Sequence, residues 1–238
     1  MRRILSFLLI LISFASTAQE LLPTSTTHQI VRHTYYTLSY SEPNEQPEWV
    51  YYELTSDMVR GKQKRTDDYR PDEKVSTISS QLEDYKGSGY DKGHLCPAGD
   101  MKLSYTSMSE SFFLSNMSPQ NKEFNDGVWN DLENKVRSWA LTKGKLYVVT
   151  AGVLTLNMGK IGPDGVTVPK YFYKVLYDSK NEKMIAFLIP NENSPKPLSY
   201  FVVTVDSVQK LTGIDFFPEL PNSLENSLES KLDISEWF

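Results

Sequence analysis

Three short polar segments in the middle of the chain hold the residue types best suited to chemistry. They are residues 90–100 (YDKGHLCPAGD), 114–120 (LSNMSPQ) and 124–133 (FNDGVWNDLE). The first segment places a histidine, His94, in a glycine-flanked strand, and the last places an asparagine, Asn125, at the start of a helix. A titratable imidazole and a neutral amide oxygen are therefore the first candidates for a reactive site.

This pair of residues suits the hydrolysis of a phosphodiester. Water must attack phosphorus in line with the departing sugar oxygen, which requires a base for its proton and positive charge to stabilise the transition state. Histidine titrates nearest to neutral pH, so His94 is the natural base. A hard divalent cation can supply the charge, and Asn125 offers it one neutral oxygen, as expected for a largely hydrated Mg²⁺.

Taken together, the three segments resemble the DNA/RNA non-specific endonuclease family, whose catalytic core is the ββα-metal finger and which includes endonuclease G-like enzymes. The family's Asp-Arg-Gly-His signature corresponds to residues 91–94 (DKGH), and its Leu-Ser-Asn-x-x-Pro-Gln element corresponds to residues 114–120. Its Asn-x-x-x-Trp-x-x-Leu-Glu helix corresponds to residues 125–133. The resemblance extends from about Trp49 to Pro218, with all three motifs in the family's order.

The resemblance implies a role for several residues. His94 would be the general base, and Asn125 would be the sole direct protein ligand of Mg²⁺, with Mn²⁺ as a substitute. Asn116 would orient His94 or hold the hairpin. Glu133, two turns along the helix from Asn125, would bind a metal-coordinated water.

Three cations complete the site that the resemblance implies. Arg137 would reach the phosphate from one turn further along the helix, and Arg65 matches the family's upstream phosphate-binding arginine. Position 92 departs from the family, because Lys92 stands where an arginine is usual. Lysine keeps the charge but cannot form a bidentate pair with phosphate, so we expect reduced or retuned activity at this site.

The hydrophobic pattern predicts an α+β fold, with a mostly antiparallel central sheet flanked by helices, and the resemblance implies a ββα-metal finger as the catalytic element. Apolar residues at spacings of three and four predict a helix over residues 125–141, ended by Gly144. A shorter helix is expected over residues 207–211, capped by Asp206 and closed by Gly213. Strands are expected over residues 49–54, 112–114, 146–153, 171–177, 184–189 and 201–205.

The two ends of the chain differ from its middle. Arg2 and Arg3, an apolar run over residues 4–14 and the small residue Ala18 predict a signal peptide over residues 1–18, and hence a secreted or periplasmic protein with no membrane attachment after cleavage. We further expect an extended N-terminal segment over residues 19–47, a nuclease domain over 48–220 and a polar C-terminal tail over 221–238.

The single cysteine, Cys96, is expected to be a small buried residue.

The formal net charge of −5 does not by itself indicate a nucleic-acid binder. A local basic cluster does exist, formed by Arg60, Lys62, Lys64, Arg65 and Arg70. We expect DNA and RNA as substrates, held through phosphate contacts that carry no base information. A non-catalytic nucleic-acid-binding relative and a phosphodiesterase acting on small substrates stay open as alternatives, as do an inhibitor protein or a homodimer as partners.

Overall fold

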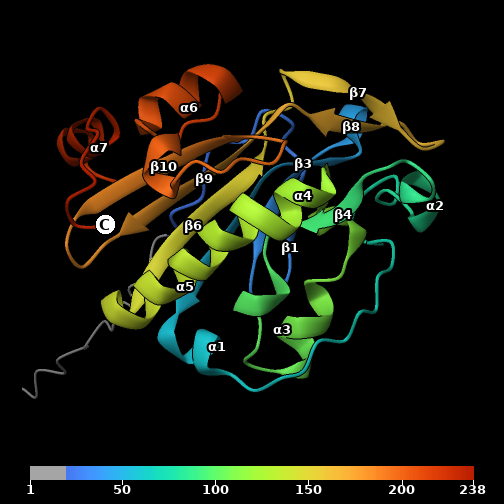
Figure 1. The fold of residues 1–238 in the computed structure, drawn as a ribbon, viewed down its shortest axis with the longest axis horizontal. Helices are drawn as coiled ribbons and strands as arrows, with labels where there is room; N and C mark the ends of the chain where they lie inside the picture. The colour runs from blue at the N-terminus through green and yellow to red at the C-terminus, as the bar shows by residue number, and fades with distance from the viewer. Residues whose placement is uncertain (1–19) are drawn as a thin grey trace, which may run out of the picture.

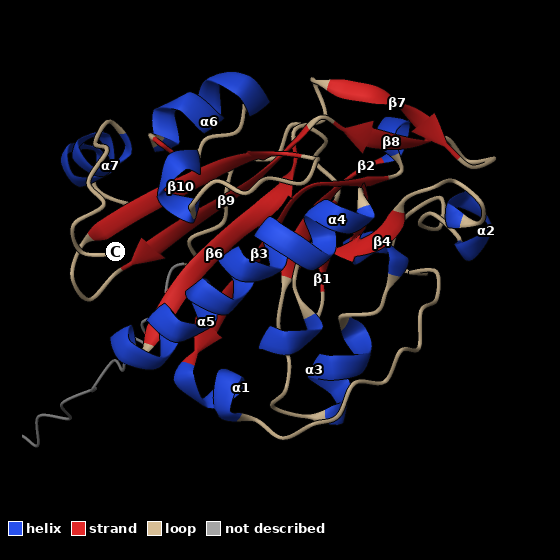
Figure 2. Cartoon of the chain, viewed as in Figure 1, coloured by secondary structure: helices blue, strands red, loops and turns tan. Residues whose placement is uncertain are grey.

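The computed structural model describes residues 20–238, so the predicted signal peptide over residues 1–18 lies outside the described residues. Its largest element is a seven-stranded sheet with the order β1-β2-β3-β6-β9-β10-β11, in which every neighbouring pair is antiparallel. The strands are β1 (Ile30–Arg32), β2 (Thr37–Ser41), β3 (Gln46–Thr55), β6 (Lys145–Gly152), β9 (Tyr171–Asp178), β10 (Lys183–Pro190) and β11 (Val202–Val203). With helices packed against this sheet, the predicted α+β class is confirmed (Figure 2).

The central strands are buried on both faces. Almost every residue of β6 and β9 is buried, so these strands appear in the sequence as continuous apolar runs instead of alternating patterns. Four predicted strands are confirmed here, at residues 49–54, 146–153, 171–177 and 184–189, each within a few residues of the observed ends. In the part of the chain that the structure describes, no helix is long and apolar enough to cross a membrane.

Helix α5 (Asn130–Lys143) runs alongside β6 and packs against β3 and β6 (Figure 1). Its inner face consists of Leu132, Val136, Trp139 and Ala140, which recur every three or four residues and are all buried. The helix ends at Gly144, whose φ of 90° suits glycine best. The predicted helix over residues 125–141 is thus confirmed, except that its first turn, η4 (Asn125–Trp129), is a π-helical turn kinked at Gly127, whose φ of −101° and ψ of −114° are not helical.

The ββα element lies beside this helix. Strand β4 (Asp91–His94) pairs with β5 (Met117–Gln120) in a separate antiparallel hairpin, and α4 (Lys122–Phe124) leads from β5 into the π-helical turn and α5. The strand expected over residues 112–114 is wrong: Phe113 makes an isolated bridge to Arg70, and η3 (Leu114–Asn116) is a 3₁₀ helix. These residues are apolar because they are packed in the interior, not because they belong to a ladder.

The C-terminal third contains two further corrections. Residues 201–205 are not one strand, because η5 (Leu198–Phe201) is a 3₁₀ helix and β11 has only two residues. Helix α6 (Val205–Thr212) is capped by Thr204 and not by Asp206, since the Thr204 hydroxyl accepts a hydrogen bond from the Ser207 amide at 3.2 Å. Gly213 ends α6 in the left-handed conformation, as expected.

Neither predicted domain boundary separates the described fold into parts. The segment over residues 19–47 supplies β1 and β2, and β3 runs across the boundary at residue 47. The tail over residues 221–238 includes α7 (Asn222–Glu229), and with α6 this helix packs against β10. Trp237 is 2% exposed, and its carbonyl accepts a hydrogen bond from Trp139 Nε1 at 2.7 Å. The tail is therefore docked on the core.

Short elements connect these layers. The β7 and β8 strands (Asn157–Ile161 and Val166–Pro169) form a hairpin that lies next to β5. The remaining helical turns are η1 (Glu42–Asn44), α1 (Ser56–Arg60), α2 (Leu82–Tyr85), η2 (Ala98–Asp100) and α3 (Tyr105–Glu110). Between α1 and α2 runs a long loop, residues 61–81, which carries four of the five residues of the basic cluster and shares a cleft with β4.

Candidate active site

A polar cleft of about 470 Å³ lies where the basic loop, the β4 strand and the start of α5 meet. Six of the seven residues predicted for the site line this cleft, and only Asn116 does not. The lining residues are Arg65, Tyr69, Lys92, His94, Pro97, Ala98, Gly99, Asn125, Asp126, Asn130, Glu133 and Arg137. Residues up to 72 positions apart in the sequence are thus gathered around one cavity.

His94 is the last residue of β4 and is held by aromatic rings. Its imidazole meets the Phe112 ring edge-on at 4.9 Å and the Tyr69 ring at 5.8 Å. Nε2 is buried and has no hydrogen-bond partner among residues 20–238, which leaves Nδ1 as the nitrogen available to the cleft. Burial, reinforced by the charges of Arg65 and Lys92, lowers the pKa of His94 to about 3, so the imidazole is neutral at pH 7.

Asn125 stands at the start of the π-helical turn, with its side chain fixed from one side. Its Nδ2 donates a hydrogen bond to Asp91 Oδ2 at 3.1 Å, which leaves the amide oxygen free to face the cleft. Glu133 lines the same cleft from two turns further along. A neutral amide oxygen beside carboxylates is a donor set that fits a hard divalent cation with a mostly aqueous shell.

Glu133 and Arg137 belong to a partly buried charge network. Arg137 Nη1 donates to Asp100 Oδ1 at 2.8 Å and lies 3.9 Å from Glu133 Oε2. Asp100 also accepts a hydrogen bond from the Tyr52 hydroxyl at 2.9 Å. Burial raises the pKa of Glu133 to about 7, although the positive charge of buried Lys174 opposes the rise. This carboxyl therefore changes protonation near neutral pH.

The other two cations, Arg65 and Lys92, line the cleft beside His94 and both contact Tyr69. Arg65 donates from Nε to Asp67 at 2.6 Å and from Nη2 to the Tyr69 hydroxyl at 3.2 Å. The Lys92 ammonium lies 5.1 Å from the centre of the Tyr69 ring. Half of the Arg65 side chain is exposed, so this arginine is held loosely at the rim of the cleft.

Among the arginines of the basic cluster, only Arg65 lines the cleft. Arg70 instead pairs with Asp68 at 2.9 Å, and its guanidinium stacks over Phe113 at 3.9 Å. Arg60 ends helix α1 and does not line the cavity. The geometry thus selects Arg65 from the three arginines that the sequence offered.

Asn116 is fully buried behind the hairpin and does not reach the cleft. Its Oδ1 accepts from the Cys96 amide at 2.8 Å, and its Nδ2 donates to the carbonyls of Cys96 and Ser111. Of the two roles left open by the sequence, the contacts match holding the hairpin, and no hydrogen bond between Asn116 and His94 is present among residues 20–238. Asn116 can therefore affect the position of His94 only through the backbone at Cys96, which it binds.

Three residues of the site were not singled out from the sequence. Asp91 belongs to the DKGH signature, which could have drawn attention to it, but its partner Asn125 lies on another element. Tyr69 contacts Arg65, Lys92 and His94 without carrying any motif. Asp100 closes the first polar segment, and only the folded structure shows that it holds Arg137.

The prediction for Cys96 agrees with the structure, and His33 is likewise buried. Cys96 is fully buried, and burial raises the pKa of its thiol well above the usual range, so it is a small core residue and not a nucleophile. His33 is packed beneath Phe113 with ring centres 4.9 Å apart, and its Nε2 lies 2.9 Å from Asp72 Oδ2. Both belong to the packed interior.

Residues 15–223 match the protein family described as DNA/RNA non-specific endonuclease. This chain belongs to that family. Among family members, the mitochondrial nuclease EXOG of Mus musculus is 34% identical over 212 residues, which are 81% of this chain and 58% of EXOG. The nuclease of Nostoc sp. is 32% identical over 83% of this chain and 76% of its own length. The chain thus spans less than two thirds of the length of the EXOG relatives it matches.

A solved structure of the family has the same fold. The matching chain comes from the crystal structure of the EndoG/EndoGI complex, which concerns the mechanism of EndoG inhibition, and it has a TM-score of 0.76 at 34% identity. The superposition covers 82% of this endonuclease-family chain and 88% of the other. The predicted family and the predicted ββα-metal fold are confirmed.

The predicted location is contradicted by the same comparisons. EXOG of Mus musculus and Homo sapiens and endonuclease G of Homo sapiens are all named as mitochondrial proteins. The prediction of a secreted or periplasmic protein relied on the basic and apolar start of the chain, which lies outside the described residues. Short basic and apolar N-terminal segments serve more than one targeting route, so this pattern was too weak to decide the compartment.

Proposed function

We propose that this protein is an endonuclease that hydrolyses the phosphodiester bonds of DNA and RNA without sequence preference, with Mg²⁺ as its cation and His94 as general base. One observation carries the proposal: the neutral imidazole of His94, the amide of Asn125 and the carboxyl of Glu133 line a single cleft together with three cations. Nuclease relatives in the same family support the reaction class.

The protein's own residues would act as follows. His94 Nδ1 takes a proton from water as its oxygen forms a bond to phosphorus, while the bond from phosphorus to the 3′ oxygen breaks. The 3′ oxygen takes a proton from solvent to become a 3′-hydroxyl, and the other product is a 5′-phosphate. Asn125 and Glu133 would hold the cation, Asn125 by its oxygen and Glu133 through the hydration shell. When bound, this cation supplies positive charge to the transition state and the leaving oxygen.

The three cations would position the phosphate. Arg65 and Lys92 approach from the loop and hairpin side, and Arg137 approaches from the helix side, held in place by Asp100. These groups address phosphate and carry no base information, which supports low sequence specificity. Bound phosphate would also offset the charges that depress the pKa of His94, so the imidazole becomes a stronger base once substrate is present.

The test is digestion of supercoiled plasmid and of RNA by the purified protein. Mg²⁺ and Mn²⁺ should both support cleavage, and chelator should abolish it. Digestion that survives chelator would refute the role of the cation. Binding of plasmid without cutting would favour the non-catalytic relative, and cleavage of a small diester without cleavage of plasmid would favour the small-substrate phosphodiesterase.

A further inference from the structure

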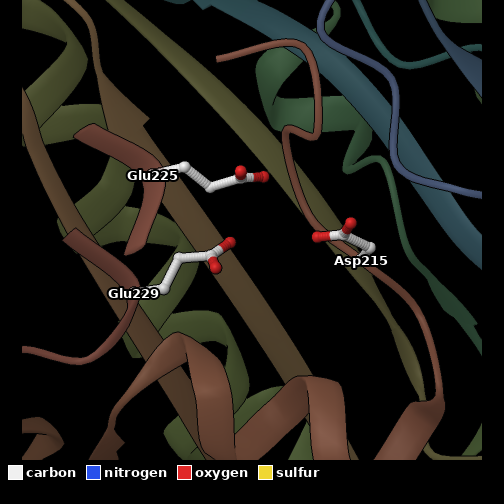
Figure 3. A group of neighbouring side chains, drawn as sticks. All are labelled: Asp215, Glu225 and Glu229. Carbon is white, nitrogen blue, oxygen red and sulfur yellow. The ribbon is translucent and has the colours of Figure 1, made fainter. Parts of the chain in front are cut away.

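Three carboxylates converge on the side of the molecule formed by α6 and α7. Asp215 follows α6, and Glu225 and Glu229 lie one turn apart on α7. Oxygen atoms of the three side chains all lie within 4.8 Å of one another. Figure 3 shows the two glutamates pointing from one side and Asp215 from the other into the same gap.

Lys210 lines the same cavity, but among residues 20–238 no salt bridge to Asp215, Glu225 or Glu229 is formed. The amide of Gln209 is shared instead, with Nε2 donating to Asp215 Oδ1 at 3.1 Å and to Glu229 Oε1 at 2.9 Å. Glu229 is only 4% exposed, and burial together with its acidic neighbours raises its pKa to about 8. Burial also raises the pKa values of Glu225 and Asp215.

A second observation points to a ligand. The Oε1 atom of Glu225 is buried and has no hydrogen-bond partner among residues 20–238. Figure 3 shows this carboxylate directed into the gap shared with Asp215 and Glu229. A buried, charged oxygen without a partner is costly, so such atoms in native proteins are normally satisfied by a bound group.

We propose that Asp215, Glu225 and Glu229 bind a calcium ion at a site separate from the catalytic cleft. Hard carboxylate oxygens are the ligands that Ca²⁺ prefers, at about 2.3–2.6 Å, so two ligands of one ion can lie up to about 5 Å apart. The spacing in the cluster lies within this limit, and a site of three carboxylates suits Ca²⁺, whereas Mg²⁺ usually keeps several waters and takes only one or two carboxylates. The cavity here measures about 580 Å³, which leaves room for waters, and it shares no lining residue with the catalytic cleft.

The site would tie together three parts of the chain that are distant in sequence. Asp215 is bonded through its backbone to Thr24, because the Thr24 amide donates to the Asp215 carbonyl at 2.9 Å and the Asp215 amide donates to the Thr24 hydroxyl at 2.8 Å. A cation shared with Glu225 and Glu229 would add α7 to this contact. We therefore expect Ca²⁺ to stabilise the fold and not to take part in cleavage.

The experiment compares thermal unfolding at pH 8 in 10 mM Ca²⁺ (roughly 10 to 100 times the dissociation constant of a modest site) with unfolding in chelator. The wild-type midpoint should rise by about 3 to 10 °C, and the E225Q/E229Q variant should lose this rise. The matched control E83Q/E182Q, which removes two exposed glutamates elsewhere, should keep it. Asn125→Ala should also keep it, which separates this site from the proposed catalytic one.

Two results would overturn the calcium site. One is a wild-type midpoint that Ca²⁺ does not raise, and the other is a rise that E225Q/E229Q retains in full. Should that double variant fold poorly, the single variant E225Q, which keeps Glu229 and its hydrogen bond from Gln209, decides the question. It should lose most of the rise caused by Ca²⁺. A full rise in E225Q would contradict the proposal.

Discussion

Replacement of Asp91 by alanine tests how the metal ligand is held. Asp91 Oδ2 accepts the hydrogen bond from Asn125 Nδ2 at 3.1 Å, and within residues 20–238 the Asn125 side chain makes no other hydrogen bond that would fix which way its amide faces. Without it, the amide is free to rotate and to present nitrogen in place of oxygen to the cleft. Loss of such a supporting partner typically weakens metal binding by about 10- to 100-fold, or about 1.4 to 2.7 kcal/mol.

The assay follows the initial rate of plasmid nicking as Mg²⁺ is varied over several orders of magnitude. In Asp91→Ala the half-saturating Mg²⁺ concentration should rise by about 10- to 100-fold, while the plateau rate recovers most of the wild-type value. Asp91→Asn keeps an oxygen acceptor, so its half-saturating Mg²⁺ concentration should lie between those of the wild type and Asp91→Ala.

Asp126→Ala provides the matched control. Asp126 lines the same cleft, but its carboxylate pairs with Lys122 at 2.7 Å and makes no hydrogen bond to the Asn125 side chain among the described residues, so its removal tests the loss of charge alone. We expect less than about a threefold change in half-saturation. An unchanged Mg²⁺ dependence in Asp91→Ala, combined with a lower plateau, would refute the orienting role of Asp91.

Three further outcomes are expected at the catalytic cleft. His94→Ala should lower the plasmid cleavage rate by about 100-fold or more with the near-UV circular dichroism unchanged, and a rate near wild type would exclude His94 as the base. Lys92→Arg restores a bidentate group and should lower KM by a few-fold, most clearly at raised salt; an unchanged KM would show that residue 92 does not contact phosphate. Glu133 has a pKa raised to about 7 and acts as a carboxylate, so the cleavage rate should increase as pH rises through 7. Glu133→Gln should abolish that increase. If the variant keeps the wild-type pH profile, the titration belongs to another group.

Much of the catalytic cleft could be predicted because its residues belong to motifs with fixed spacing. Glu133 and Arg137 are four residues apart on one helix, so their shared face follows from helical geometry alone. The contacts that hold these residues could not be predicted in the same way. Asp100 reaches Arg137 and Asp91 reaches Asn125 across separate elements, and no periodicity records such pairings.

The prediction of the strands also succeeded in part and failed in part, for physical reasons. The central strands were found because burial on both faces produces long apolar runs, as in β6 and β9. Strands β1 and β2 were missed because they are short and lie in a polar, proline-containing segment. The strand expected over residues 112–114 fails for the opposite reason, since Phe112 and Leu114 are apolar to fill the interior around the hairpin.

The turn at Asn125–Trp129 is interrupted at Gly127, whose φ of −101° and ψ of −114° are not helical. Asn125 and Glu133 therefore stand on two helical pieces joined by a kink, and their common place in the cleft lining does not follow from the rotation of one regular helix. A substitution that let the helix continue straight through position 127 would move the amide of Asn125 relative to Glu133, although neither side chain is itself changed.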